Sequence, residues 1–367
     1  MSNGLSNTPP ERKGVTLGAP LGKAGLPNQM LGKGLTLVIS LVLTLLLGEV
    51  LARVVFRQSM DFDMEMWKYA TQVKIVIDDP RMVYEHRPNS RAFLMGVEVA
   101  TNRFGLRGGE TTLEKPANTY RIAVIGDSIA MGWGVLQDQT YAVQLERMLN
   151  AQRPDCFPQG MRYEVLNLGV GNYNTVQEVT RLRNLGLQFD PDIILLGYFI
   201  NDAEPVPKPR RGFLIEHSYL YALTASRLQV LLGRNFRSLT YEEYYRGLYS
   251  DGQSGWQEAQ TALRELVRLG HERNIPVVIY LIPELHDLSG TYPFADIHRT
   301  VITLGTDLGL PVVDLLPSFS GYSPEKELWV SPTDAHPNAL AHSMIAQALY
   351  ESLRKRLPRG HLDWKKC

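Results

Sequence analysis

Four short polar clusters, each close after an apolar stretch, contain the residue types needed for nucleophilic attack on an ester. They are Gly126-Asp-Ser128, Gly169-Val-Gly171-Asn172, Asn201-Asp202 and Asp334-Ala-His336. A serine hydroxyl becomes a nucleophile when an imidazole accepts its proton and a carboxylate orients the imidazole ring. Backbone amides at glycine turns and an asparagine side chain can donate hydrogen bonds to the oxyanion that forms on the attacked carbonyl. The clusters therefore predict acyl transfer, provided that the fold brings them together.

Each cluster also has an ordinary structural interpretation when it is considered alone. Ser128 suits the start of a helix, the two glycines suit a tight turn between a strand and a helix, and Asn201 suits a cap. A single histidine is usually structural, although His336 with an aspartate two residues earlier is a better candidate for a general base. The order of the four clusters along the chain is therefore stronger evidence than any cluster by itself.

An alternation of strands and helices from residue 120 onwards predicts how the clusters are positioned. Apolar runs predict strands, and apolar residues at helical spacing predict helices. The predicted strands are 120–126, 163–169, 192–200, 275–282 and 310–316, and the predicted helices are 139–150, 175–187, 257–273 and 338–357. Such alternation predicts a parallel sheet with helices on both faces, and ligands bind at the carboxyl ends of its strands. The polar clusters are expected at that edge.

Two further segments precede or interrupt this alternation. Residues 57–119 form a connecting region that has no repeat and suggests no function. Residues 203–255 are an insertion rich in tyrosine and arginine. One interpretation of the insertion is a cap with aromatic side chains beside the site, and the other is a helical segment that packs around a small core of its own. We favour the second interpretation, because loops and insertions are common in such folds.

The N-terminal part of the sequence predicts a membrane anchor. Residues 1–33 are rich in Gly, Pro, Ser and Asn and predict a flexible tail, and residues 358–367 form a short C-terminal tail. Residues 34–56 are strongly apolar and, as a helix at about 1.5 Å per residue, would extend about 34 Å, enough to cross a bilayer. A cleaved signal peptide and a buried or interfacial helix are the alternatives. No small-residue cleavage site follows the apolar run, which favours an uncleaved anchor.

The distribution of positive charge does not decide the direction of insertion. Four basic residues precede the uncharged part of the apolar run and four follow it, namely Arg12, Lys13, Lys23 and Lys33 before it and Arg53, Arg57, Lys68 and Lys74 after it. An N-terminal signal followed by a long globular domain usually exports that domain. We therefore expect a single-pass membrane protein whose domain of residues 120–357 lies outside the cytoplasm, in the periplasm.

The composition excludes several other classes of protein. The 367 residues contain 38 Lys and Arg against 38 Asp and Glu, so the chain lacks the cationic excess of a nucleic-acid-binding protein. The two cysteines, Cys156 and Cys367, support neither a disulfide framework nor a thiolate metal site. None of the eight histidines belongs to an H-E-x-x-H pattern, and we predict neither a metal nor a cofactor.

The order Ser, Gly, Asn and Asp/His over residues 120–355 resembles that of the SGNH hydrolases, also called GDSL-type esterases, of the membrane-anchored bacterial type. The resemblance implies an α/β three-layer sandwich with a parallel five-stranded sheet of flavodoxin type. It further implies that Ser128 is the nucleophile, that His336 is the general base and that Asp334 orients the base. The implied oxyanion hole consists of the backbone amide of Ser128, a backbone amide at Gly171 or Asn172, and the side-chain amide of Asn201.

Two features of this sequence depart from the family pattern. The second cluster of the family usually has glycine where this chain has Asn172. Since any residue except proline supplies a backbone amide, Gly171 and Asn172 both remain candidates. The aspartate of the family commonly stands three residues before the histidine, whereas Asp334 stands two residues before His336. This spacing leaves Asp314 as the alternative acid.

Another hydrolase fold also requires comparison. Residues 126–130 loosely fit the G-x-S-x-G nucleophile elbow, with alanine in the last position. That fold places its elbow well inside the sheet sequence. Here Ser128 ends the first strong strand, and the candidate acid and base share one loop, so the SGNH pattern is favoured.

The resemblance implies a serine esterase that acts through an acyl-enzyme on O-acyl esters, in particular O-acetyl esters. The expected substrates are acylated cell-envelope carbohydrate or small esters. The alternative enzymes are an O-acyltransferase to glycan hydroxyls and a lipid esterase. A non-catalytic glycan-binding module of an envelope complex is the alternative from a different class. Reaction of Ser128 with a serine-directed fluorophosphonate would separate an enzyme from such a module.

Overall fold

The computed structural model describes residues 26–151, 160–209, 211–233 and 239–356. Residues 1–25 of the predicted flexible tail, both cysteines and the predicted C-terminal tail lie outside the described residues. The chain divides into two units, residues 1–50 and residues 51–367, and each unit is considered separately.

The first unit contains most of helix α1 (Leu26–Phe56), which begins earlier than the apolar segment predicted from residue 34. Within this helix, Met30–Phe56 is a stretch of 27 residues that contains an 18-residue window with a mean hydropathy of 2.4. The stretch is long and apolar enough to cross a membrane. A membrane-spanning helix and a signal sequence share these properties. The prediction of one apolar N-terminal helix is therefore confirmed, and its direction in a membrane stays a prediction.

The second unit is built on a five-stranded parallel sheet. Its strands are β5 (Thr119–Gly126), β6 (Arg162–Asn167), β7 (Ile193–Tyr198), β8 (Val277–Leu281) and β9 (Val312–Asp314). They are ordered β6-β5-β7-β8-β9, and each adjacent pair is parallel. With the strands counted in chain order, this is the flavodoxin-like order 2-1-3-4-5. The predicted fold class is confirmed.

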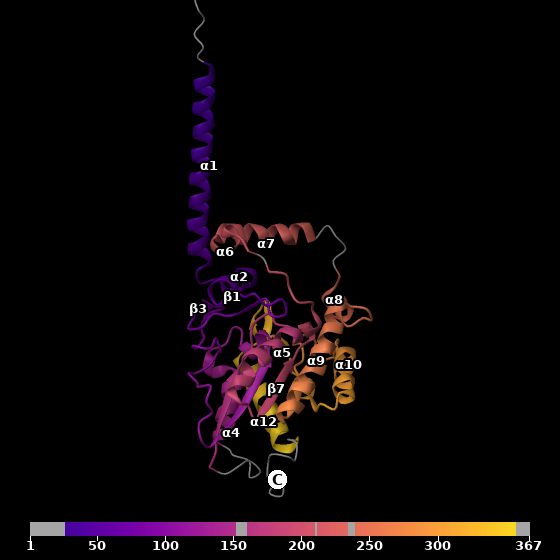
Figure 1. Ribbon diagram of the computed structural model, residues 1–367. Helices are drawn as coiled ribbons and strands as arrows, with labels where there is room; N and C mark the ends of the chain where they lie inside the picture. The colour runs from indigo at the N-terminus through magenta and orange to yellow at the C-terminus, as the bar shows by residue number, and fades with distance from the viewer. Residues whose placement is uncertain (1–25, 152–159, 210, 234–238, 357–367) are drawn as a thin grey trace, which may run out of the picture. The chain divides into compact units, whose positions relative to one another are not determined.

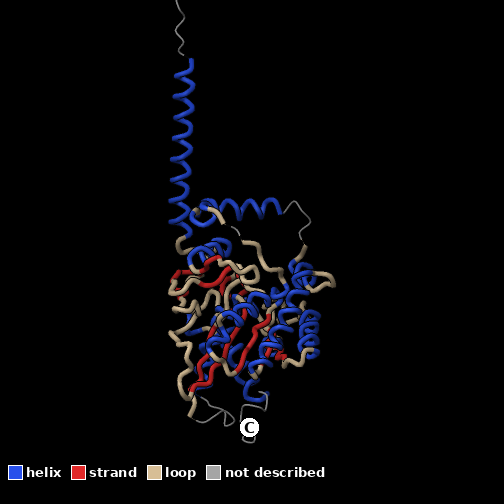
Figure 2. Tube along the Cα trace, in the orientation of Figure 1, coloured by secondary structure: helices blue, strands red, loops and turns tan. Residues whose placement is uncertain are grey.

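The central strands are apolar because both faces of the sheet are covered. Every residue of β5, β7 and β8 is buried, as a parallel sheet between two helix layers requires. Two helix pairs form these layers: α4 (Tyr141–Ala151) packs against α12 (Ala339–Arg356), and α5 (Thr175–Asn184) packs against α9 (Ser254–Arg273). Figures 1 and 2 show the sheet between these pairs. Helix α10 (Ala295–Asp307), which contacts β9, is not among the helices that the sequence patterns predict.

The connecting region 57–119 is folded and packs against the chain that follows β5. It consists of helix α2 (Phe62–Gln72) and two antiparallel strand pairs, β1 (Lys74–Val76) with β2 (Tyr84–His86) and β3 (Arg91–Leu94) with β4 (Val97–Ala100). Several of its buried side chains, among them Tyr69 and Leu94, form an apolar cluster with Met131 and Trp133. Strands of three or four residues carry too little alternation to be predicted from sequence.

The insertion 203–255 forms three helices that do not enclose a core. They are α6 (Phe213–His217), α7 (Tyr219–Gly233) and α8 (Tyr241–Leu248). None of their described side chains is buried. On α8, Tyr245 and Leu248 are half-buried against the main core of the domain. The favoured interpretation, that the insertion packs around its own small core, is therefore wrong, because its apolar residues are exposed or packed elsewhere.

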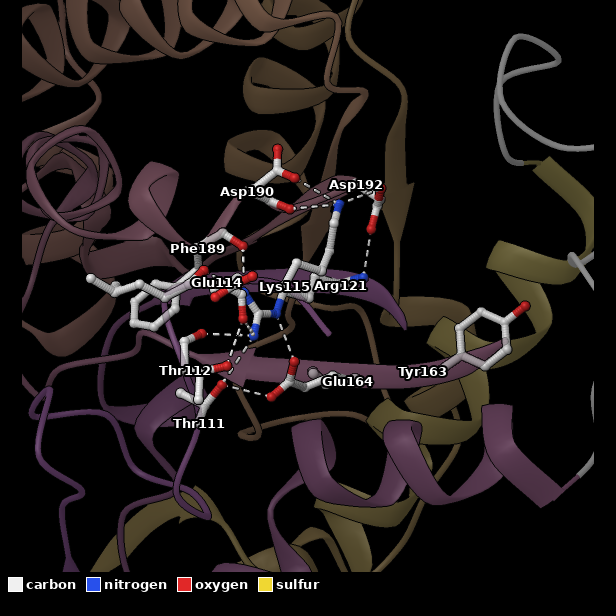
Figure 3. A network of polar contacts seen from close by, with 12 residues as sticks. Thr111, Thr112, Glu114, Lys115, Arg121, Tyr163, Glu164, Phe189, Asp190 and Asp192 are labelled. Atoms are coloured by element: carbon white, nitrogen blue, oxygen red, sulfur yellow. Dashed lines mark hydrogen bonds and ion pairs between the residues drawn. The ribbon is translucent and has the colours of Figure 1, made fainter. Parts of the chain in front are cut away.

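A buried arginine joins the connecting region to the amino end of the sheet (Figure 3). Arg121 on β5 is fully buried, and its Nε donates to Oε2 of Glu164 on β6 at 2.7 Å. Its other guanidinium nitrogens donate to the backbone carbonyls of Thr112, Leu113 and Phe189. The backbone amide of Arg121 donates to Asp192. These contacts fix the segment before β5 at the end of the sheet remote from Ser128.

Replacing Arg121 with methionine is expected to lower the free energy of unfolding by about 3 to 5 kcal/mol, because Glu164 and several carbonyls lose their donor. Urea unfolding followed by circular dichroism measures this change. Arg147→Met is the matched control, since Arg147 pairs with Asp138 where both side chains are more than 60% exposed. The control is expected to change stability by less than about 0.5 kcal/mol. Equal losses in the two variants would contradict the structural role of the network.

Candidate active site

Ser128 begins a one-turn helix immediately after β5. Helix α3 (Ser128–Met131) is capped by Asp127, whose Oδ1 accepts a hydrogen bond from the backbone amide of Ile129 at 2.8 Å. Close packing requires glycine at the end of β5, since a Cβ on Gly126 would lie 2.7 Å from the Cβ of Ala130. This turn places Ser128 at the carboxyl edge of the sheet, where it lines a cavity although it is only 5% exposed.

The structure brings Ser128 into contact with His336, which lies 208 residues further along the chain. Oγ of Ser128 lies 2.9 Å from Nε2 of His336. Nδ1 of the same ring lies 2.5 Å from Oδ1 of Asp334. The other carboxylate oxygen, Oδ2, accepts a hydrogen bond from the indole N–H of Trp133 at 2.9 Å. Serine, histidine and aspartate therefore form a continuous series of hydrogen bonds, the geometry that an activated nucleophile needs.

Asp334 and His336 lie on one strand of a small antiparallel hairpin rather than in a simple loop. The hairpin consists of β10 (Trp329–Ser331) and β11 (Asp334–Pro337). Residues two apart on a strand point to the same face, which brings the carboxylate to the imidazole despite the short spacing. Pro337 ends β11. Asn338 then caps α12, because its side-chain oxygen accepts hydrogen bonds from two backbone amides of that helix.

Of the two candidate acids, Asp334 is the one that contacts the base. Asp314, at the end of β9, lies 3.0 Å from Nδ1 of His298 through its Oδ1. Burial opposes the ionisation of Asp334, but hydrogen bonds from His336 and Trp133 hold its pKa below the usual value of an aspartate. The carboxylate is therefore ionised at neutral pH and can stabilise an imidazolium.

Two aromatic side chains pack against the imidazole of His336. Phe62 of α2 stacks on it with ring centroids 6.0 Å apart and an angle of 28° between the rings, and Trp133 lies 6.1 Å away. The sequence patterns single out neither residue, because Phe62 belongs to no motif and Trp133 lies outside the Ser128 cluster. The five-residue distance from Ser128 to Trp133 is the only signal that links an aromatic residue to this site.

The structure distinguishes Gly171 from Asn172 as candidate amide donors. The amide of Gly171 already donates to the hydroxyl of Tyr69 at 2.7 Å. Asn172 has a φ of 63°, a left-handed conformation that glycine adopts freely and asparagine tolerates. This conformation explains how asparagine takes the place of the usual glycine, and it makes the Asn172 amide the better candidate.

The other two candidate donors lie beside Ser128. The amide of Ser128 is the first of α3 and so has no partner within the helix. Asn201 lies in the short 3₁₀ helix η3 (Ile200–Ala203) after β7, and its Nδ2 donates to Oδ2 of Asp127 at 3.1 Å. An amide nitrogen carries two hydrogens, so a second one remains for an oxyanion. Ser128, Asn172 and Asn201 all line the same cavity.

Side chains from the connecting region hold the turn that carries Asn172. Nζ of Lys74 donates to the carbonyl of Gly171 at 2.6 Å and to the side-chain oxygen of Asn172 at 3.0 Å. The hydroxyl of Tyr84 donates to the carbonyl of Asn172 at 2.5 Å. Lys74 is buried, and burial lowers its pKa well below the usual value of a lysine. Sequence reasoning misses this support because it links segments that are far apart along the chain.

The cavity has a volume of about 1490 Å³ and lies within the second unit. Beside the residues named above, it is lined by Tyr241, Tyr245, Glu284, His286 and Trp329. Glu284 is buried and contacts the His286 ring, and this hydrogen bond raises the pKa of His286. Because α8 supplies the two tyrosines, the insertion lies beside the site, as the alternative interpretation of a cap predicts. Across the described ranges, no group of three or more His, Cys, Asp or Glu residues is arranged to hold a metal ion.

Comparisons with known proteins find one matching family model and several similar solved structures. The model of the GDSL-like lipase/acylhydrolase family matches residues 124–344. Similar solved structures include the acetyl xylan esterase AlAXEase, which is 16% identical in sequence. The match covers 64% of this chain and 99% of the esterase chain, with a TM-score of 0.39. They also include the acetylxylan esterase Axe2 from Geobacillus stearothermophilus (14% identical, 64% and 94% covered, TM-score 0.41) and a lipase/acylhydrolase from Enterococcus faecalis (16% identical, 65% and 97% covered, TM-score 0.39). No curated protein matches the sequence.

The matched segment covers more than half of the chain and contains every candidate residue of the site, from Ser128 to His336. The protein therefore belongs to the GDSL-like lipase/acylhydrolase family and is a hydrolase of carboxylic esters.

Proposed function

We propose that the protein is a serine esterase that hydrolyses O-acyl esters of carbohydrate, in particular O-acetyl esters, through an acyl-enzyme. The observation that carries the proposal is the 2.9 Å contact between Oγ of Ser128 and Nε2 of His336 at the wall of the cavity. A non-catalytic binding module would not need this contact, nor a carboxylate held ionised behind the imidazole.

The first half of the reaction forms the acyl-enzyme. Nδ1–H of His336 donates to Asp334, which leaves the lone pair of Nε2 free to accept the proton of Ser128 as Oγ attacks the ester carbonyl. The oxyanion accepts hydrogen bonds from the amides of Ser128 and Asn172 and from Nδ2 of Asn201. Each such donor lowers the barrier by about 2.7 to 4 kcal/mol at most. The imidazolium then donates its proton to the leaving hydroxyl of the alcohol.

The second half of the reaction releases the acid. A water molecule takes the place of the leaving alcohol, and His336 accepts one of its protons as the water oxygen attacks the acyl carbonyl. The tetrahedral intermediate collapses when the imidazolium returns the proton to Oγ of Ser128. The bond between the acyl group and Ser128 breaks, and the free enzyme is restored.

The cavity lining supports a carbohydrate substrate. Tyr241 is 49% exposed and presents a ring, while Glu284 and His286 supply polar groups close to it. Aromatic faces beside a few convergent polar groups suit sugar rings, which have apolar faces and hydroxyl edges. Because only 5% of Ser128 is exposed, we expect short acyl groups to reach it more readily than long ones.

Release of acetic acid from an acetylated oligosaccharide, compared with hydrolysis of p-nitrophenyl acetate, tests the substrate class. Tyr241→Ala is expected to raise KM for the oligosaccharide about tenfold and to leave the p-nitrophenyl acetate rate nearly unchanged. Tyr244→Ala is the matched control, since Tyr244 lies on the same helix and does not line the cavity. Higher activity on p-nitrophenyl laurate than on the acetate would indicate a lipid esterase. Ester loss only in the presence of a glycan acceptor would indicate a transferase.

We also propose that α1 is an uncleaved single-pass anchor and that the esterase domain lies in the periplasm. The largely apolar stretch of 27 residues and the lack of a small-residue cleavage site after it support this proposal. After a carbonate wash, the full-length chain is expected to stay in the membrane pellet, and protease added to spheroplasts is expected to digest its domain. Release by carbonate or protection from the protease would contradict the proposal.

A further inference from the structure

Helices α6 and α7 present an exposed apolar surface. Phe213 and Leu214 on α6 are 76% and 56% exposed, and Leu228 and Leu231 on α7 are 55% and 59% exposed. The fifteen residues of α7 include one charged residue, Arg227, and no acidic residue. A helix this apolar normally buries its leucines against a core. No described side chain of α7 is buried, and these four side chains stay more than half exposed within the described residues.

Hydrogen bonds fix these helices to the last turn of α1 and to α2. Nη2 of Arg53 donates to the backbone carbonyl of His217 at 2.6 Å. The indole N–H of Trp67 on α2 donates to the carbonyl of Ile215 at 2.6 Å. Figure 1 shows α2, α6 and α7 close together, in agreement with their contacts. The apolar surface is therefore attached to the residues that would emerge from a membrane.

The length of the chain limits how far α7 can lie from a bilayer. The apolar stretch ends at Phe56, and Asp61, which forms an ion pair with Arg227, follows five residues later. Five residues span at most about 18 Å even when fully extended. If the apolar stretch crosses a bilayer, α7 is held close to the membrane surface.

The charge of the segment is complementary to anionic lipid headgroups. Between residues 207 and 239 the sequence has one acidic residue, Glu216, and six basic ones: Lys208, Arg210, Arg211, Arg227, Arg234 and Arg237. Clusters of basic residues beside a membrane-spanning segment are attracted to anionic lipids, and tyrosines are frequent at the level of the headgroups. Tyr219 and Tyr221 occur at the start of α7.

We propose that α6 and α7 lie in the interfacial region of an anionic lipid bilayer, with their exposed leucines and Phe213 among the acyl chains. At such an interface, apolar side chains are buried at the boundary between headgroups and acyl chains. The segment that binds the lipid also lines the catalytic cavity through Lys208, Arg211 and Ile215. Membrane binding therefore places the cavity beside the headgroups, where an ester attached to the membrane can reach it.

Depth-dependent fluorescence quenching of the full-length chain tests this proposal. The protein is reconstituted into vesicles of three parts phosphatidylcholine and one part phosphatidylglycerol, and flotation confirms that it is bound. Leu228→Cys or Leu214→Cys, made with Cys156→Ser and Cys367→Ser, carries an environment-sensitive dye. Glu258→Cys on α9 is the matched control, since Glu258 is exposed and lies outside the insertion.

Nitroxide-labelled lipid is expected to lower the emission at positions 214 and 228 at least about twofold and to leave position 258 nearly unchanged. Replacing both Leu228 and Leu231 with glutamate is expected to abolish quenching at position 214. The same double variant is expected to hydrolyse p-nitrophenyl acetate at the normal rate, because neither leucine lines the cavity. This assay separates the membrane-binding surface from the proposed esterase mechanism, since either can fail without the other.

Three results would overturn the proposal. Failure of the full-length chain to float with the vesicles is one, and equal lack of quenching at positions 214, 228 and 258 is another. The third is a dye at position 228 that is shielded only at high protein-to-lipid ratio, because that result would assign the surface to a second copy of the chain.

Discussion

Replacing Ser128 with alanine is expected to lower kcat for p-nitrophenyl acetate by about 10⁴- to 10⁶-fold, the range found when the nucleophile of a serine hydrolase is removed. The physical reason is that, among the residues that the structure describes, only the hydroxyl of Ser128 hydrogen-bonds Nε2 of His336, at 2.9 Å. Activity that remains would come from the oxyanion donors alone. Initial rates at saturating substrate measure the effect.

The expected loss is chemical rather than structural. Ser128→Ala removes one oxygen atom and leaves α3 and its cap by Asp127 unchanged, so the unfolding transition is expected to stay at the same temperature. Ser318→Ala, at an exposed serine of α11 (Leu316–Phe319), is the control and is expected to keep the full rate. A Ser128→Ala enzyme that retains more than a few per cent of the normal rate would refute the assignment of the nucleophile.

Replacing Asp334 with asparagine is expected to lower kcat by about 10⁴-fold, because the amide favours the wrong imidazole tautomer. An asparagine side chain can donate to Nδ1 of His336, which places the ring proton on Nε2, where the lone pair for Ser128 is needed. Asp314→Asn is the matched control, since Asp314 contacts His298 and does not contact His336. We expect the control to change kcat by less than about threefold, because losing the contact with His298 would lower the stability of the fold rather than the reaction rate. A larger loss in Asp314→Asn than in Asp334→Asn would reverse the assignment of the acid.

Comparison of the wild-type protein with Asp334→Asn also tests how stability depends on pH. The pKa of Asp334 in the folded protein is lower than in the unfolded chain, so its ionised form stabilises the fold above the unfolded value. That contribution is lost as the pH falls through the lower, folded pKa. The unfolding free energy of the wild-type protein is therefore expected to decrease more steeply below about pH 4 than that of Asp334→Asn.

The sequence predicts the sheet and the place of Ser128 directly after β5, because these features are local. An apolar run such as residues 192–200 predicts a buried strand directly, and a polar cluster after such a run falls at its carboxyl end. The insertion shows where such reasoning fails. Tyrosine and arginine content does not reveal whether a segment packs on itself. In the structure the helices of the insertion have no buried side chain among the described residues, and α6 and α8 line the cavity.

The supporting residues of the site depend on contacts between distant segments. Phe62 and Lys74 come from a region without any motif, and they reach the site only because that region folds against the chain after β5. The choice between Gly171 and Asn172 depends on a backbone angle and on the hydroxyl of Tyr69, which no spacing reveals. The choice of Asp334 over Asp314 depends on a hairpin whose strands have only three and four residues.

Labelling of the active protein with a fluorophosphonate, followed by mass spectrometry of its peptides, tests the central claim most directly. A fluorophosphonate reacts with a serine that a neighbouring base activates, and it leaves a phosphonyl group on the attacking oxygen. Ser128 is predicted to be the modified residue, with activity lost in proportion to labelling and with no labelling in His336→Gln. Modification of a different serine, or full activity while Ser128 is phosphonylated, would contradict the account.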